Sequence, residues 1–202
     1  MKLAIFDLGQ VCIHTHYERS YEAWEKLAGL PQNSIPRTAL EVEEHYRYER
    51  GESDCRSFAA WFCERFSLSL SYEQWVEGWN AMFHGVIGPT ETVVRGLRDQ
   101  GVRLAILSNT NLCHYRCWSQ DYADFVGLFD QLYVSHEMGL RKPDPKIYET
   151  LLQREGVAAG DAVFFDDKIE NIEAARACGI DSIHCTAEES AYDWWQQQQR
   201  SR

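Results

Sequence analysis

The chain has 202 residues, of which 45% are hydrophobic, and this is enough apolar material for one packed domain with or without an insertion. Its formal net charge is −11 and it has no run rich in Lys or Arg, so we expect neither nucleic acid nor an anionic membrane as a partner. No apolar run approaches the roughly 20 residues that span a bilayer, and Asp7 interrupts the first run too early for a signal peptide, so we expect a cytoplasmic protein.

The first apolar run, residues 2–11, reads KLAIFDLGQV and predicts a buried strand that ends at Asp7. After it, large apolar residues recur at helical spacing in four segments, 17–29, 39–51, 55–66 and 72–83, without a strand signal between them. We therefore expect an α-helical cap over residues 15–86, inserted into a core formed by residues 1–14 and 87–202.

From residue 89 onward, predicted helices and strands alternate. Near-continuous apolar runs predict strands at 102–108, 131–135, 162–165 and 181–185. Helices are predicted at 90–100, 146–155 and 169–178 and after the last strand, and the polar tail 196–202 is expected to be frayed. Strands that alternate with helices of about ten to fifteen residues predict an α/β fold with a doubly wound parallel sheet.

The seven cysteines are odd in number and show no paired spacing. Cys113, His114 and Cys117 come closest to a metal-binding pattern, but no second ligand pair follows at the spacing of a zinc site. We interpret the cysteines as scattered thiols in a reducing compartment.

Polar side chains follow the predicted strands at the points where the strands end. They are Asp7 after the first strand, Ser108 and Asn109 after the second, Lys142 in the loop after the third, and Asp166 and Asp167 after the fourth. Each of them alone is typical of a turn or a helix cap. Because open parallel sheets bind ligands outside the carboxyl ends of their strands, the four groups together predict one site.

The segments that carry these residues read FDLGQV, LSNTN, RKPDP and VFFDDKIENI. In this order they resemble the four motifs of the haloacid dehalogenase superfamily, whose members are mostly Mg²⁺-dependent phosphatases with a Rossmann-like core. Residues 15–86 resemble the helical cap of such enzymes, and HYRYERGE at 45–52 is similar to bacterial α-D-glucose-1-phosphate phosphatases. The resemblance implies a phosphatase that acts on a small phosphorylated metabolite, a sugar phosphate such as glucose 1-phosphate.

The resemblance also implies a role for each residue that would contact the phosphate. Asp7 is the expected nucleophile, and it would form an aspartyl-phosphate that water then hydrolyses. Lys142 would offset the charge of the phosphoryl group and of Asp7. Ser108, together with the backbone at Asn109 and at Leu8 and Gly9, would hold the phosphoryl oxygens.

Mg²⁺ is the cofactor that the resemblance implies, and it prefers oxygen ligands. The expected ligands are one oxygen of Asp7, the main-chain carbonyl of Gly9 and the carboxylate of Asp167. Asp166 is expected to lie close to the ion or behind its ligands. Asn171 is expected to orient the acidic loop or Lys142.

Gly9 departs from the family pattern, because most phosphatases of the superfamily carry at this position a second Asp, which protonates the leaving oxygen. The loss of a general acid commonly lowers the rate by about 10²–10⁴-fold. An anomeric hydroxyl is a more acidic leaving group than an ordinary alcohol, so a sugar 1-phosphate would reduce this loss. His14 and His16 enter the cap and are interpreted as loop histidines, with a proton relay as the alternative.

Two alternative functions fit part of the pattern. A 2-haloacid dehalogenase uses the same strand-end Asp without a metal, but the adjacent acids Asp166 and Asp167 favour metal-dependent chemistry. A catalytically weak phosphometabolite-binding protein is favoured only by Gly9. The sequence does not indicate an oligomeric state. The cap offers polar and aromatic residues that could contact a sugar or serve its own core and surface, namely His45, Tyr46, Arg47, Glu49, Arg50 and Trp79.

Overall fold

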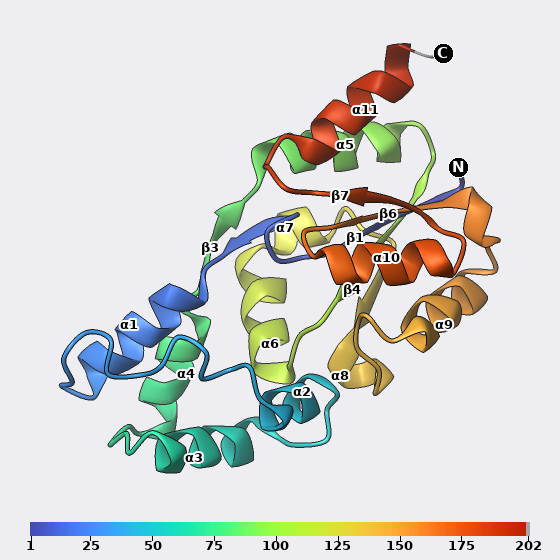
Figure 1. Ribbon diagram of the computed structural model, residues 1–202. Helices are drawn as coiled ribbons and strands as arrows, with labels where there is room; N and C mark the ends of the chain where they lie inside the picture. Colours follow the sequence, from blue (N-terminus) through green and yellow to red (C-terminus); the bar gives the residue numbers. More distant parts are fainter. Residues whose placement is uncertain (201–202) are drawn as a thin grey trace.

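A computed structural model describes residues 1–200 and has a five-stranded parallel sheet at its centre (Figure 1). The strands lie in the order β5-β4-β1-β6-β7, so the first strand of the chain is the middle of the sheet. In register, Ile5 of β1 lies opposite Ala105 of β4 and Phe164 of β6. The strand bounds are β1 Leu3–Phe6, β4 Arg103–Ser108, β5 Gln131–Val134, β6 Ala162–Asp166 and β7 Asp181–His184. The prediction of a parallel α/β sheet is confirmed.

Helices cover both faces of this sheet. Because successive side chains of a strand point to opposite faces, Leu3 and Ile5 belong to one buried cluster, whereas Ala4 and Phe6 belong to another. The cluster around Ile5 is closed by α9 (Pro145–Glu155) and α10 (Ile169–Ala177). The other cluster is closed by α5 (Gly88–Asp99), α6 (Leu112–Asp121), α7 (Ala123–Val126) and α11 (Ser190–Arg200).

The last helix differs from its prediction, because α11 continues to Arg200, so the expected frayed tail is wrong for residues 196–200. Residues 201 and 202 lie outside the described residues. Trp195 packs against α5 so closely that a Cβ on Gly96 would lie 2.5 Å from its ring. This contact anchors the helix that carries the glutamines. Two short elements complete this part of the chain, α8 (Ser135–Met138) and a 3₁₀ helix (Ala159–Asp161).

Four helices between β1 and β4 form a separate group at the end of the molecule opposite α5 and α11 (Figure 1). They are α1 (Tyr17–Leu27), α2 (Glu43–Glu49), α3 (Cys55–Arg65) and α4 (Tyr72–Asn80). Their core is aromatic: Trp24 and Trp79 are fully buried and stack with ring centroids 5.5 Å apart. The start of α4 has the capping box of Ser71 and Gln74. The division of the chain into a core and a cap stays a proposal, which this grouping supports.

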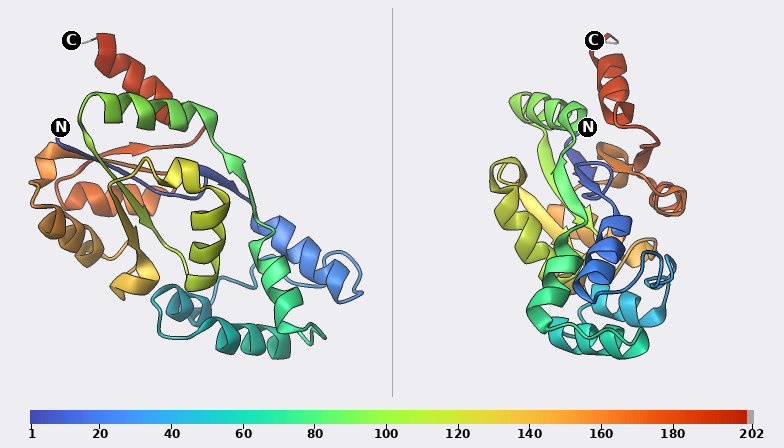
Figure 2. Two further views of the ribbon diagram at one scale, coloured as in Figure 1. Left: turned by 180° about the vertical axis from the view of Figure 1, so that it is seen from behind. Right: turned by 90° about the vertical axis from the view of Figure 1, so that its left-hand side faces the viewer.

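A two-stranded antiparallel ribbon, β2 (Ile13–Thr15) with β3 (Phe83–Val86), connects the sheet to α1 and α4 (Figure 2). No strand was expected within residues 15–86, so the ribbon differs from the prediction. The helix α6 was also not predicted. Three or four residues are too few for an alternating pattern to stand out, and the ribbon carries His and Gly at its positions. Within residues 1–200, no helix combines the length and the apolar character needed to cross a bilayer.

Candidate active site

The carboxyl ends of β1, β4 and β6 meet at one edge of the sheet, where a cavity of about 260 Å³ opens toward the helical cap. Its position follows from the fold, because three neighbouring parallel strands deliver their terminal side chains to the same edge. Most of the residues predicted from the sequence line this cavity, namely Asp7, Leu8, Gly9, Ser108, Asn109, Lys142, Asp167 and Asn171. Asp166 is the exception, since it is fully buried beneath them.

Lys142 is the charged centre of the site, with only 1% of its surface exposed. Its Nζ donates hydrogen bonds to Asp7 Oδ1 at 2.7 Å, to Asp166 Oδ2 at 2.7 Å and to the Leu107 carbonyl at 2.8 Å. An ammonium group has three protons, so all of its donors are satisfied. Burial alone would lower the pKa of Lys142, but the carboxylates of Asp166 and Asp7 outweigh that effect and raise it. Lys142 is therefore a fixed positive charge between two acids.

The side chain of Asn109 holds the Lys142 loop in place, a role that the sequence did not suggest. Asn109 Nδ2 donates to the Lys142 carbonyl at 2.9 Å, and the Lys142 amide donates to Asn109 Oδ1 at 2.8 Å. Both polar ends of the amide are thus engaged, and one N–H of Nδ2 is left over. The expected contact between the backbone of Asn109 and a phosphate stays a prediction.

The two adjacent acids, Asp166 and Asp167, differ in their surroundings. Asp166 Oδ1 accepts from the Lys168 amide at 2.8 Å and from Asn171 Nδ2 at 2.9 Å, and its Oδ2 accepts from Lys142. Asn171 therefore orients the acidic loop through Asp166. The Asp167 carboxylate lines the cavity, and among the described residues its one hydrogen bond comes from its own backbone amide. Of the two, Asp167 is the one with an oxygen left to bind a cation.

Three carboxylates are close enough to share one cation. One oxygen from each of Asp7, Asp166 and Asp167 lies within 4.8 Å of the others. The main-chain carbonyl of Gly9 also accepts no hydrogen bond among residues 1–200, because the turn from Leu8 to Ile13 closes through the Leu8 and Ile13 carbonyls. An all-oxygen set, with one unbonded oxygen on Asp7, the carboxylate of Asp167 and the carbonyl of Gly9, fits Mg²⁺.

The crowding of negative charge changes the acidity of this group. Burial, reinforced by the charges of Asp166 and Asp167, raises the pKa of Asp7 to about 7, although Lys142 acts in the opposite direction. Burial and the neighbouring Asp166 also raise the pKa of Asp167. A bound cation at this position would keep these carboxylates ionised at neutral pH.

The absent side chain at Gly9 leaves space that Thr15 occupies. A Cβ on Gly9 would lie 3.0 Å from Thr15 Oγ1, and Thr15 lines the same cavity. His14 and His16 do not line the cavity of Asp7 and Asp167. Both stack on His84, at ring-centroid distances of 5.1 and 4.7 Å. The structure therefore places a threonine hydroxyl, and no histidine of this ribbon, beside the bare position.

A second chamber, of about 310 Å³, lies beneath α2 next to the cavity that Asp7 and Asp167 line, and it shares Glu49, Arg141 and Lys142 with that cavity. Of the cap residues singled out in the sequence, His45, Tyr46 and Glu49 line this chamber. The remaining three do not: Arg47 and Arg50 pair with acids on the cap surface, and Trp79 is buried in the cap core.

Arg141 was not predicted from the sequence. It binds Glu49 Oε2 through Nε at 3.0 Å and through Nη2 at 2.9 Å, so it ties α2 to the loop that carries Lys142. Ser135 adds a second tie, because its hydroxyl lies 2.6 Å from the Glu49 carbonyl and 2.8 Å from the Thr110 carbonyl. These contacts join residues far apart in the sequence, and no local pattern marks them.

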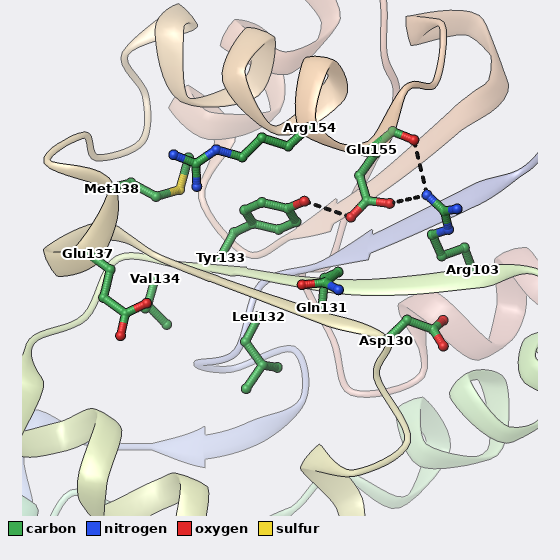
Figure 3. Close-up of a pocket in the computed structure, with 10 residues that line it drawn as sticks. All are labelled: Arg103, Asp130, Gln131, Leu132, Tyr133, Val134, Glu137, Met138, Arg154 and Glu155. Carbon is green, nitrogen blue, oxygen red and sulfur yellow. Dashed lines mark hydrogen bonds and ion pairs between the residues drawn. The ribbon is translucent and has the colours of Figure 1, made fainter.

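A larger cavity, of about 470 Å³, lies along β5 (Figure 3). None of Asp7, Asp166 and Asp167 lines it. Its buried carboxylate, Glu155, accepts from the Tyr133 hydroxyl at 2.7 Å and from Arg103 at 2.6 Å. These polar groups satisfy one another, and none of the predicted strand-end residues lines this cavity. The smaller cavity, which the predicted strand-end residues line, is therefore the candidate active site.

Comparison with known proteins indicates the family of the chain. The family model for haloacid dehalogenase-like hydrolases matches residues 1–179. A sesquiterpene phosphatase of Aspergillus oryzae is 33% identical over 95 residues, which is 47% of this chain and 48% of that protein. A D-ribitol-5-phosphate phosphatase of Bacteroides thetaiotaomicron is 23% identical and covers 98% of this chain and 96% of its own length.

The fold is also found among solved structures. A HAD family enzyme of Bacteroides thetaiotaomicron, in complex with magnesium and inorganic phosphate, aligns with a TM-score of 0.75 at 23% identity. The alignment covers 91% of this chain and 93% of that one. At this identity the likeness concerns the fold alone.

Proposed function

The chain belongs to the haloacid dehalogenase-like hydrolase family, and from this premise we propose that it is a Mg²⁺-dependent phosphatase of small phosphomonoesters. The proposed substrate is a sugar phosphate such as glucose 1-phosphate, and the proposed intermediate is an aspartyl-phosphate on Asp7. Its phosphatase relatives support the reaction type, and the D-ribitol-5-phosphate phosphatase supports a small hydroxylated substrate.

One observation carries the proposal: a buried carboxylate at a strand end is held by a buried ammonium group and faces a cavity. Asp7 Oδ1 is fixed by Lys142, whereas Oδ2 accepts no hydrogen bond from residues 1–200. A carboxylate with one oxygen held and the other free is positioned to attack. An ordinary structural ion pair would not leave such an oxygen at the wall of a cavity beside a second unpaired acid, Asp167.

The reaction then proceeds in two steps. Asp7 forms a bond to phosphorus while the bond from phosphorus to the leaving oxygen breaks, and water later hydrolyses the aspartyl-phosphate. Lys142 offsets the charge on Asp7 and on the phosphoryl group, and Ser108 with the backbone at Leu8–Gly9 and Asn109 holds the phosphoryl oxygens. The arrangement of donors around a shielded cavity stabilises charge that develops during the transfer.

Asp7, the Gly9 carbonyl and Asp167 would hold the magnesium ion, and Asp166 would act behind them by fixing Lys142. When bound, the ion supplies positive charge that polarises the phosphoryl group and keeps the carboxylates ionised. The binding partner is a small phosphorylated metabolite, and the cytoplasmic location stays a prediction.

The test is turnover of p-nitrophenyl phosphate and glucose 1-phosphate with magnesium, in the wild type and in Asp7→Asn. We expect turnover that excess chelator abolishes and that Asp7→Asn lowers by at least about 10³-fold, as for loss of a nucleophile. Hydroxylamine should trap the phosphorylated wild type but not the variant. Release of halide from a 2-haloacid in excess chelator, without phosphatase turnover, would instead establish the dehalogenase alternative. Phosphate binding without turnover would establish the binding-protein alternative.

A further inference from the structure

The chamber beneath α2 contains a buried histidine with one unused nitrogen. His45 is 5% exposed, and its Nδ1 lies 2.9 Å from the Leu40 carbonyl oxygen. Because a carbonyl only accepts, Nδ1 carries the proton. Burial lowers the pKa of His45, so the ring is neutral and Nε2 is a bare acceptor. Among residues 1–200, Nε2 has no hydrogen-bond partner.

A second free acceptor lies beside it. Glu49 uses Oε2 to bind Arg141, and its Oε1 accepts no hydrogen bond from the described residues. Oε1 lies 3.9 Å from His45 Nε2, and two acceptors cannot bond to each other. The two residues are on one helix, four apart, so their side chains lie side by side on the face of α2 that lines the chamber.

The charges around this pair bear on what it can bind. Arg141 already offsets the negative charge of Glu49, and the other charged residues of the chamber carry both signs, namely Arg37, Lys142, Lys168, Glu41 and Glu170. The acceptor pair therefore does not require a cationic ligand group, and a neutral donor can bind to it without an unpaired charge. Hydroxyl groups are neutral donors, and two hydroxyls on adjacent carbons are close enough together to reach both acceptors.

We propose that His45 Nε2 and Glu49 Oε1 form an acceptor pair that binds two hydroxyls of the leaving group. The chamber shares Glu49, Arg141 and Lys142 with the catalytic cavity, so a substrate whose phosphate lies at Asp7 extends into it. The pair makes the enzyme selective for polyhydroxylated phosphoesters over esters that lack the matching hydroxyls. This inference rests on the proposed phosphatase function and specifies its substrate class.

The experiment compares kcat/KM for glucose 1-phosphate with kcat/KM for its 2-, 3-, 4- and 6-deoxy analogues. In the wild type we expect two of the deoxy analogues to lose about 10-fold or more, because each leaves one buried acceptor unpaired. In His45→Phe one of these two should lose less than about 2-fold relative to the parent sugar, since the partner of its missing hydroxyl is gone. The matched control is His84→Phe, which removes a histidine outside the chamber and should keep the wild-type pattern.

The outcomes separate the two claims. No turnover of any of these esters, or of p-nitrophenyl phosphate, would overturn the proposed function and this inference with it. Turnover with equal kcat/KM for all deoxy analogues in the wild type would overturn the acceptor pair alone, and this arm does not require a variant to fold. A His45→Phe protein with a native circular dichroism spectrum and an unchanged deoxy pattern would also overturn it.

Discussion

Replacing Lys142 by Met should destabilise the fold as well as impair catalysis. The change removes the only ammonium group that Asp7 and Asp166 contact among residues 1–200, and it leaves two buried carboxylates next to each other. Removing one partner of a buried ion pair costs about 3–5 kcal/mol, because the remaining charge is buried and uncompensated. Met keeps the length of the side chain, so the loss of charge dominates over the loss of packing.

The destabilisation should depend on pH with a definite sign. The pKa of Asp7 in the folded wild type is about 7, above its ordinary value of 3.8, and Lys142 acts to lower it. In the variant this pKa rises further, so the folded state keeps a proton that the unfolded state has lost. Above pH 7 the variant therefore continues to lose stability with rising pH, by up to about 1.4 kcal/mol per unit, whereas the Asp7 contribution in the wild type no longer changes.

The assay is urea unfolding of both proteins between pH 6 and pH 8.5, in chelator so that no cation replaces the ammonium. Lys146→Met is the control, because Lys146 is exposed on the neighbouring helix and its ammonium group has no partner among the described residues. Its effect should stay within about 0.5 kcal/mol. Equal stability of Lys142→Met and the wild type at pH 8.5 would refute the view that Lys142 balances the charge of this site.

Three further predictions concern neighbouring groups. Asp167→Asn should lower magnesium-dependent turnover by about 100-fold or more, because it removes a proposed ligand of the ion. Its stability in urea should not fall, because the change also removes the repulsion between Asp167 and Asp166. A turnover near that of the wild type would contradict the metal site. Burial lowers the pKa of His114 to about 3 in the folded state, below its ordinary value of 6.5. Between these two pH values the unfolded state binds a proton that the folded state does not, so the free energy of unfolding should fall by up to about 1.4 kcal/mol for each pH unit below 6.5. His114→Phe should therefore flatten the pH dependence of unfolding in this range, and an unchanged slope would contradict the buried neutral ring. Gly9→Asp should weaken the dependence of kcat/KM on leaving-group pKa, provided that Thr15 moves away from the new side chain, and an equally steep dependence would count against a missing general acid.

The family and the position of the site could be predicted from the sequence because both depend on local order along the chain. Apolar runs that each end in a polar residue predict parallel strands. The carboxyl ends of such strands lie at one edge of the sheet, and this does not depend on the conformation of the loops. The four motifs identified the haloacid dehalogenase superfamily, which the family model confirms. The substrate subgroup stays a proposal, since it depends on the cap.

The different roles of Asp166 and Asp167 were expected only through the family resemblance, because adjacent acids look alike in a sequence and neither pattern nor spacing tells them apart. Asp166 is the last residue of β6, and its side chain points into the protein, where Lys142 and Asn171 bind it. Asp167 is the next residue and faces the cavity. Successive side chains of a strand point to opposite sides, so two adjacent acids at a strand end lie in different surroundings. Which of the two faces the cavity depends on how the strand is oriented in the sheet.

The same alternation bears on the bare position at Gly9. Along β2 and its continuation, His14 and His16 stack on His84, and Thr15 between them lines the catalytic cavity. A hydroxyl in the space of a missing carboxylate can accept or pass on a hydrogen bond, but its proton is far too weakly acidic to replace a carboxylic acid. Under the proposed mechanism, the leaving oxygen must then depart with little help from the side chains around Gly9. That demand is smallest for an acidic leaving group such as an anomeric hydroxyl. The geometry around Gly9 therefore favours the proposed anomeric leaving group, and the acceptor pair proposed on α2 separately favours a leaving group with several hydroxyls.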